Sequence, residues 1–361
     1  MKEKERNVNY ELLRIIAMIM IVALHYTGFS GAIEHVKVFS FNYYFIILIR
    51  VLTSISVNIY ILITGYYMVN SKIKTKNILN IWFKTWTYSV LGFFLICILE
   101  NKISIKNMIR ALLPYSAEEY WFVTAYLTLY IFIPYLNFFI KKLDKINHKK
   151  LIVTGFVIFC LIAVVFENTS IRINRGLSVL WFIYLYLIAS YIRLYVNFEE
   201  IDIKKLFYIF LCSLFFSVMI LSFCNMLFNK YVDRICNNNS PTILIISICF
   251  FVFFYYVKIN NIFFKKQIIK LSKLTFAVYL IHQNKYLSPI IWKIFDSSKY
   301  VNTKFLVLHF GISVFVIFCV SILIELLRNK IFVIFSKIFN NNKIKKKMIN
   351  IDEILNIKTL E

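Results

Sequence analysis

Residues 9–29 read NYELLRIIAMIMIVALHYTGF, an apolar stretch that contains Arg14 and His25. A membrane-spanning helix needs about 20 predominantly apolar residues, and this stretch has that length. The two ionisable residues are eleven positions apart, close to three helical turns, so they lie on one helix face. Glu11, one turn before Arg14, lies on the same side and can pair with it. Because an ionisable group in lipid costs about 3 kcal/mol or more, this face is expected to point into a cavity inside the protein.

A second interpretation of the same face needs no cavity. Arg14 near one end of the helix and His25 near the other can each snorkel to the nearer membrane interface. For either residue alone this is the better explanation, whereas the shared face of the pair favours a functional site.

The rest of the chain has the composition of a membrane protein. Of 361 residues 60% are hydrophobic and 17% are charged, against about 25% charged residues in soluble domains. Apolar runs recur from end to end. They predict an all-α bundle of about ten transmembrane helices at 9–29, 42–68, 78–99, 120–140, 150–166, 177–196, 206–228, 241–257, 271–291 and 305–327. The ninth run is expected to be a broken or partly re-entrant helix, because four polar residues follow one another from His282 to Lys285.

Lys and Arg lie mainly between the apolar runs, and the loops of one side carry most of them. The positive-inside rule therefore predicts cytoplasmic N- and C-termini in a multi-pass protein of the cytoplasmic membrane. This placement explains the net charge of +24 without a nucleic-acid partner. We expect one membrane domain over residues 1–340 and a basic cytoplasmic tail over 341–361, lying against anionic membrane lipid.

Histidine and arginine in one cavity suit a particular kind of chemistry. His25 can remove a proton from a hydroxyl group near neutral pH, and Arg14 can hold a phosphate or a carboxylate. The seven cysteines are scattered without metal-ligand spacing, so no metal site is expected. Arg50 and Glu325 lie near predicted span ends, where snorkelling or local pairing accounts for them.

The segment from Glu11 to His25 resembles the opening motif of the membrane acyltransferase 3 family, an arginine followed after ten residues by a histidine. Three further segments are similar to that family in the same order. They are Asn58–Tyr66 (NIYILITGY), Tyr120-Trp121-Phe122 with Pro134, and Thr275–His282 (TFAVYLIH). The resemblance implies a ten-helix fold that transfers an acyl group, commonly acetyl from acetyl-CoA, to a hydroxyl of an exported or cell-surface glycan. Acyl-CoA is then a donor substrate, and no permanently bound cofactor is implied.

Carried over by resemblance, His25 is the catalytic base or an acyl carrier, and Arg14 contacts the donor or positions the histidine. The candidates for substrate or donor binding are Glu11, Asn58, Trp121, Tyr279 and His282. His282 either supports the catalytic site or satisfies a buried carbonyl or Gln283, and Trp121 either stacks on a sugar or anchors the membrane interface.

One feature departs from the family. Many relatives carry an Arg-x-x-Arg pair after the second span, where this chain has Lys72, Lys74, Lys76 and, further on, Lys84. These lysines can attract CoA phosphates, or they can simply reflect positive-inside topology.

Two other classes of membrane protein share this composition, a transporter or flippase for a lipid-linked glycan and a glycan polymerase. Transporters often contain Gly- and Pro-interrupted half-repeats, and this chain has 7 Gly, 4 Pro and no repeat. The longest predicted outer loop lies near 100–119, short for a polymerase. Both observations favour the acyltransferase, and the sequence predicts no oligomeric state.

Overall fold

The computed structural model describes residues 7–165, 173–228 and 236–338, with side chains to Ile331. It is 78% helical, and the described residues form no strand. The predicted basic tail at 341–361 lies outside the described residues. An all-α fold is therefore confirmed.

Among the described residues, six helices are long and apolar enough to cross a membrane. They are α1 (Val8–Phe29), the continuous pair α3 (Phe41–Ser54) and α4 (Ser56–Met68), α5 (Thr75–Glu100), α7 (Trp121–Lys141), α11 (Ile203–Phe228) and α16 (Leu306–Ile338), whose span is Leu306–Ile331. Two shorter apolar helices are α10 (Val179–Tyr195) and α12 (Pro241–Phe253). The count of ten spans and the side of the termini stay predictions.

The remaining predicted spans are interrupted helices. Around 150–166 the chain forms α8 (Lys145–Phe156), a π-helical turn at Val157–Ile162 and the short α9 (Ala163–Val165). Around 271–291 it forms α13 (Ile262–Ser272), α14 (Thr275–His282) and α15 (Ser288–Ile294). The remaining short helices are α2 (Ala32–His35), α6 (Ile105–Leu112), η3 (Asn174–Gly176) and η4 (Phe198–Glu200).

The break after α14 is where the polar run predicted it, and Asn284 fixes it. Its Oδ1 accepts the backbone N–H of Tyr286 at 2.9 Å, and its Nδ2 donates to the Tyr88 carbonyl at 2.9 Å and the Tyr120 hydroxyl at 2.8 Å. The amide thus satisfies backbone groups that a membrane interior would otherwise leave without partners.

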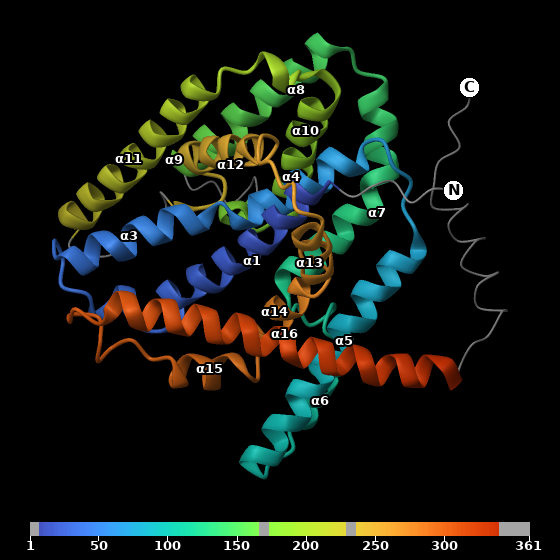
Figure 1. Cartoon of the computed structure of the whole chain (residues 1–361), viewed down its shortest axis with the longest axis vertical. Coiled ribbons are helices and arrows are strands. Elements are labelled where there is room, and N and C mark those ends of the chain that lie inside the picture. Colours follow the sequence, from blue (N-terminus) through green and yellow to red (C-terminus); the bar gives the residue numbers. More distant parts are fainter. Residues whose placement is uncertain (1–6, 166–172, 229–235, 339–361) are drawn as a thin grey trace.

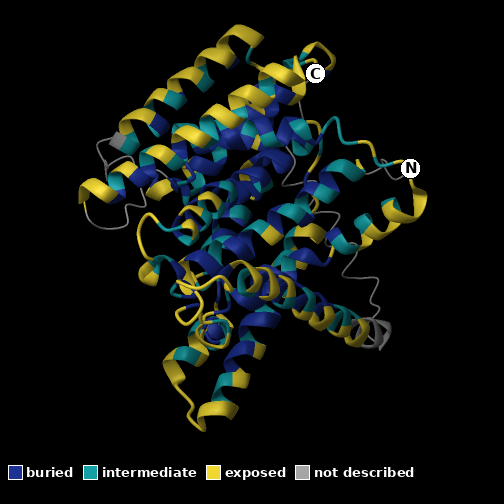
Figure 2. Cartoon of the chain, turned by 60° about the vertical axis from the view of Figure 1, so that its left-hand side comes forward, coloured by how far each residue is buried: buried dark blue, intermediate teal, exposed yellow. Residues whose placement is uncertain are grey.

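Helix α1 lies in the middle of the bundle, between α3 and α16 (Figure 1), and also contacts α4, α13 and α14. Exposed residues lie on the outward sides of the long helices, and buried residues gather in the middle (Figure 2). On α11, Phe215 is 68% and Phe216 56% exposed, as expected of side chains that face lipid. The helix with the two unusual ionisable residues therefore lies inside the bundle.

Candidate functional site

A cavity of about 1220 Å³ follows α1 along most of its length. Its lining includes Glu11, Arg14, Met18, Ile21 and His25, which recur every three or four residues. This is the shared face that the spacing predicted, and it points into the protein. The volume exceeds the roughly 300–1,000 Å³ of ordinary small-molecule pockets.

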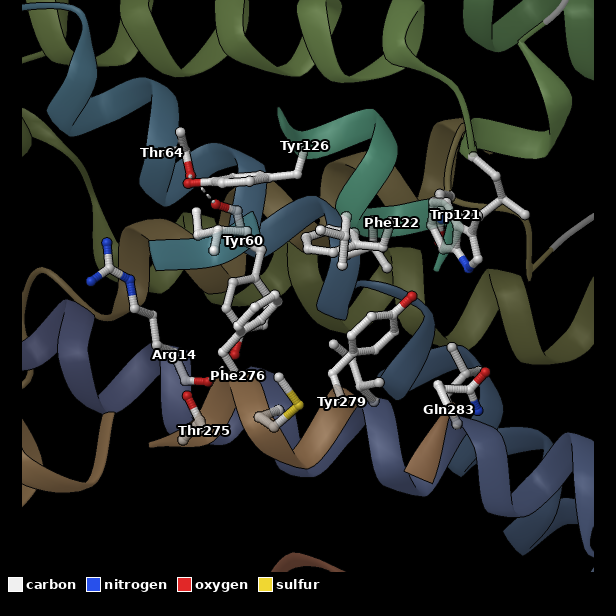
Figure 3. Close-up of a pocket in the computed structure, with 18 of the residues that line it drawn as sticks. Arg14, Tyr60, Thr64, Trp121, Phe122, Tyr126, Thr275, Phe276, Tyr279 and Gln283 are labelled. Atoms are coloured by element: carbon white, nitrogen blue, oxygen red, sulfur yellow. Dashed lines mark hydrogen bonds between the residues drawn. The ribbon is translucent and has the colours of Figure 1, made fainter. Parts of the chain in front are cut away.

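Aromatic side chains from α4, α7 and α14 form the other walls. Figure 3 shows Arg14 and Gln283 at opposite ends of the drawn site, with Tyr60 and Tyr279 between them. Tyr60 donates a hydrogen bond to the Arg14 carbonyl at 2.9 Å, which ties α4 to α1. The cavity therefore has an Arg14 end and a His25 end, which we name by these two residues.

At the His25 end, two histidines are joined in a hydrogen-bonded chain. His25 Nδ1 lies 2.9 Å from His282 Nε2, and His282 Nδ1 lies 2.5 Å from the Val278 carbonyl oxygen. A carbonyl only accepts, so His282 Nδ1 carries a proton and the Nε2 of a neutral His282 is an acceptor. His25 Nδ1 must then donate to it. The remaining nitrogen, His25 Nε2, is left with a lone pair, and within the described part of the chain it makes no hydrogen bond.

At the Arg14 end, Arg14 Nη1 lies 2.8 Å from Glu11 Oε1, the predicted pair, and the Arg14 side chain is 32% exposed. Lys84 of α5 and Lys273, just after α13, also line this cavity. Lys84 lies over the Phe276 ring, with Nζ 5.9 Å from its centroid. Three cations from three segments thus surround one end of the cavity.

Lys84 is held by a buried carboxylate. Its Nζ lies 2.7 Å from Glu325 Oε1, and Glu325 is 0% exposed. The same carboxylate accepts from Arg328 at 2.7 and 2.9 Å and from the Tyr88 hydroxyl at 2.7 Å. Snorkelling or local pairing was expected for Glu325, and the contact with Arg328 is such a local pair. The contacts across to α5 were not expected.

The candidates taken from the sequence divide into three groups. Glu11, Trp121 and Tyr279 line the cavity with Arg14 and His25. His282 forms the second group: it is 0% exposed and lies behind His25. It contacts His25, as a residue that supports the site would, and it also satisfies the buried Val278 carbonyl.

Asn58 alone forms the third group. It is 0% exposed and is not among the lining residues. Its Nδ2 donates to the Asn238 carbonyl at 2.9 Å and to Ser247 Oγ at 3.1 Å, and its Oδ1 accepts from Trp181 Nε1 at 3.0 Å. Asn58 therefore supports the cavity wall from behind.

Sequence reasoning gave no site role to several polar lining residues, among them Arg50, Arg175, Lys273 and Gln283. Placing Arg50 at a span end was wrong, because it is the tenth residue of α3 and lines the cavity. A charge within an apolar run was the available signal. Lys72, Lys74 and Lys76 are exposed and do not line the cavity, so only Lys84 of that group reaches it.

Apolar helices around a cavity with aromatic walls, a histidine pair at one end and cations at the other define a multi-pass membrane protein with an enzyme-like site. The family model described as acyltransferase domain matches residues 7–326. The chain belongs to the membrane acyltransferase 3 family and is a membrane acyltransferase. Comparison with curated proteins and with solved structures finds no match.

Proposed function

We propose that this protein transfers an acyl group, most simply acetyl, from acyl-CoA to a hydroxyl of a cell-surface or exported glycan, with His25 as the general base. The observation that carries the proposal is the chain from the Val278 carbonyl through His282 to His25. It orients the His25 ring and keeps Nε2 unprotonated, which is the form that a base requires.

In the proposed step, His25 Nε2 takes the proton of the acceptor hydroxyl as its oxygen attacks the thioester carbonyl carbon. A C–O bond forms and the C–S bond breaks. The imidazolium of His25, still donating through Nδ1 to His282, then returns the proton to the departing CoA sulfur. The products are the glycan ester and free CoA thiol, so atoms and charge balance.

The donor is expected to lie with its phosphates at the Arg14 end. Arg14, Lys84 and Lys273 line that end, and their charges match an anionic nucleotide group. Arg14 and His25 are separated by roughly 16 Å along the helix axis at 1.5 Å per residue. An extended pantetheine arm can bridge this separation and bring the thioester to His25.

Gln283 is the proposed donor to the oxyanion that develops on the thioester carbonyl. Its side chain lines the cavity directly after His282, and its Nε2 is buried without a hydrogen-bond partner among the described residues. A buried, unpaired amide costs about 1–3 kcal/mol, so its retention favours a role with bound substrate.

The test uses the purified protein in liposomes, radiolabelled acetyl-CoA and the glycan isolated from cells that lack this gene. His25→Ala should abolish transfer of label, while His309→Ala should retain it. His309 is the matched control because it also contacts α1, through a hydrogen bond of 2.7 Å with the Tyr26 hydroxyl, but does not line the cavity.

Two outcomes contradict the proposal. Full labelling of the glycan by the His25→Ala variant excludes His25 as the general base. If cells that lack this gene lose glycan export, and not the O-acyl signals in their NMR spectra, the result favours a transporter. A third outcome, label found on His25 after rapid denaturation near neutral pH, identifies an acyl carrier in place of a base.

A further inference from the structure

A second cavity, of about 790 Å³, adjoins the His25 end of the first one. Two residues line both cavities, Phe29 of α1 and Gln283, which lies at one end of the site in Figure 3. The Phe29 ring is 54% exposed, and its centroid lies 5.5 Å from that of the His25 ring. The second cavity therefore borders the proposed base, with one aromatic ring between them.

Three segments that are far apart in the sequence form the walls of this second cavity. They are α2 with the end of α1, the loop that follows α6, and the chain on either side of α15. The Ser297 N–H donates to the Ser30 carbonyl at 2.9 Å, which holds the first wall to the third. Lys285 holds the third wall to the second, because its Nζ lies 3.2 Å from Glu119 Oε1. Direct contacts thus fix the three walls to one another.

The lining of the second cavity carries nearly balanced charge. Among the described lining residues there are four carboxylates and three Lys or Arg side chains. They are Glu34, Glu118, Glu119, Asp296, Arg110, Lys285 and Lys293. This balance does not favour a polyanion such as the nucleotide of acyl-CoA, which the cations at the Arg14 end suit better. The second cavity therefore suits an uncharged ligand and not the donor.

The Glu119 side chain provides an unpaired hydrogen-bond acceptor in this lining. It is 2% exposed, and its Oε1 lies 2.8 Å from Arg110 Nε and 3.2 Å from Lys285 Nζ. Its Oε2 is buried and has no hydrogen-bond partner in the described part of the chain. Leaving a buried polar atom unpaired is costly, the more so for a charged group. A ligand that donates a hydrogen bond to Oε2 removes that cost.

Trp292 of α15 provides an unpaired donor in the same lining. It is 5% exposed, and its Nε1 is buried without a partner among the residues that the structure describes. Its ring packs against Phe29 and His282, with centroids 6.2 and 6.5 Å apart. One acceptor and one donor without partners therefore belong to a single cavity, and the donor belongs to a ring that touches the histidine pair.

We infer that the second cavity binds an uncharged, hydroxyl-rich sugar residue of the acceptor glycan, next to the sugar whose hydroxyl is acylated at His25. The inference rests on the proposed function. A sugar hydroxyl both donates and accepts, so it can donate to Glu119 Oε2 and accept from Trp292 Nε1. The exposed Phe29 ring adds the apolar surface that ligand sites combine with a few polar groups. Donor and acceptor then approach His25 from opposite directions along α1.

Both unpaired atoms are buried, so binding requires neighbouring side chains to move. Arg110 and Lys285, which contact the Glu119 carboxylate, have side chains that are 39% and 42% exposed. These long side chains have room to turn towards solvent. The glycan reaches the cavity over its rim, where Glu34 and Lys293 are exposed.

The first experiment measures binding without transfer. Oligosaccharides released from the glycan of cells that lack this gene are titrated against His25→Ala protein in nanodiscs. Adding Glu119→Gln should raise the dissociation constant about 10- to 100-fold, because a hydrogen bond to a charged group is lost. Adding Trp292→Phe should raise it about 3- to 10-fold, because a neutral hydrogen bond is lost. Permethylated oligosaccharides have no hydroxyl to donate, so they should bind equally weakly with and without Glu119→Gln.

The second experiment measures transfer in the liposome assay with His25 intact. Glu119→Gln and Trp292→Phe should raise the acceptor KM by the same factors and leave the KM for acetyl-CoA unchanged. Phenylalanine keeps a ring against His282, so this variant tests the indole N–H. Glu100→Gln and Trp82→Phe are the matched controls, because both residues are exposed and line neither cavity.

The two proposals fail in different ways. Wild-type protein that binds the oligosaccharides but transfers no label from acetyl-CoA contradicts the proposed function and leaves the sugar site intact. An unchanged dissociation constant and acceptor KM in both variants overturn the sugar site and leave the acyltransferase intact. A fall in kcat with an unchanged acceptor KM shows that Glu119 and Trp292 act on the histidine pair, and it also overturns the sugar site.

Discussion

Lys84 Nζ lies 2.7 Å from Glu325 Oε1, in an ion pair that joins α5 to α16 and holds a cation at the wall of the cavity. The two residues are far apart in sequence, and Glu325 lies at the end of the matched family region, at residues 7–326. The carboxylate also binds Arg328 and Tyr88. A single buried carboxylate on α16 thus holds a cation of the cavity wall.

Glu325→Gln should destabilise the protein strongly, because it leaves Lys84 and Arg328 without their shared negative charge. Breaking a buried ion pair typically costs about 3–5 kcal/mol. The measurement is thermal unfolding in detergent, compared with Glu100→Gln, whose side chain is exposed at the end of α5. Equal melting temperatures for the two variants would show that the cluster contributes no stability.

Lys84→Met should raise the KM for acetyl-CoA about tenfold, because one charge-assisted contact with the donor is lost. Arg328 still pairs with Glu325 in this variant. Lys74→Met is the matched control, because Lys74 is exposed in the loop before α5 and does not line the cavity. A larger rise in the KM for acetyl-CoA in Lys74→Met than in Lys84→Met would indicate that the loop lysines bind the donor.

His282→Ala should lower kcat by about 10²-fold or more, because His25 loses the acceptor that fixes its tautomer. His282→Gln, whose amide can both accept and donate, should recover part of the rate. Kinetics with saturating acetyl-CoA measure both variants. An unchanged kcat and pH profile in His282→Ala would mean that His282 only packs against α1.

Gln283→Leu should lower kcat about 10²- to 10³-fold, the usual effect of removing an oxyanion donor. It should leave the melting temperature unchanged or higher, since an unpaired buried amide is removed. Activity and thermal unfolding are measured on the same preparation. Parallel loss of stability and activity would indicate a purely structural role.

Gly65→Ala should destabilise the bundle by about 1–3 kcal/mol through overpacking, because the new Cβ would lie 2.7 Å from Ala189 Cβ and 3.1 Å from the Tyr186 backbone. Gly311→Ala is the matched change in α16, where nothing lies within 4 Å. There the substitution should stabilise the helix by up to about 1 kcal/mol. Thermal unfolding of both variants checks the sign, and equal effects would contradict a close contact at Gly65.

Much of the architecture was predictable because the membrane imposes it locally. Apolar runs must form helices to satisfy their backbone groups, so most of the long helices begin and end within a few residues of the predicted limits. The break after His282 was predictable from consecutive polar residues. The interrupted helices at 145–165 were not, because a π-helical turn leaves no pattern in side-chain polarity.

The sequence alone determined the face of α1, since helical periodicity fixes which residues lie above one another, and it placed Arg14 and His25 together. The partners of that face were decided by tertiary structure. His282 behind His25, Lys84 held by Glu325, and Arg50 opposite Gly28 come from helices whose own sequences do not specify what they pack against. A residue's side on its own helix follows from 3.6 residues per turn, whereas its neighbour across the cavity depends on how all the helices fill space together.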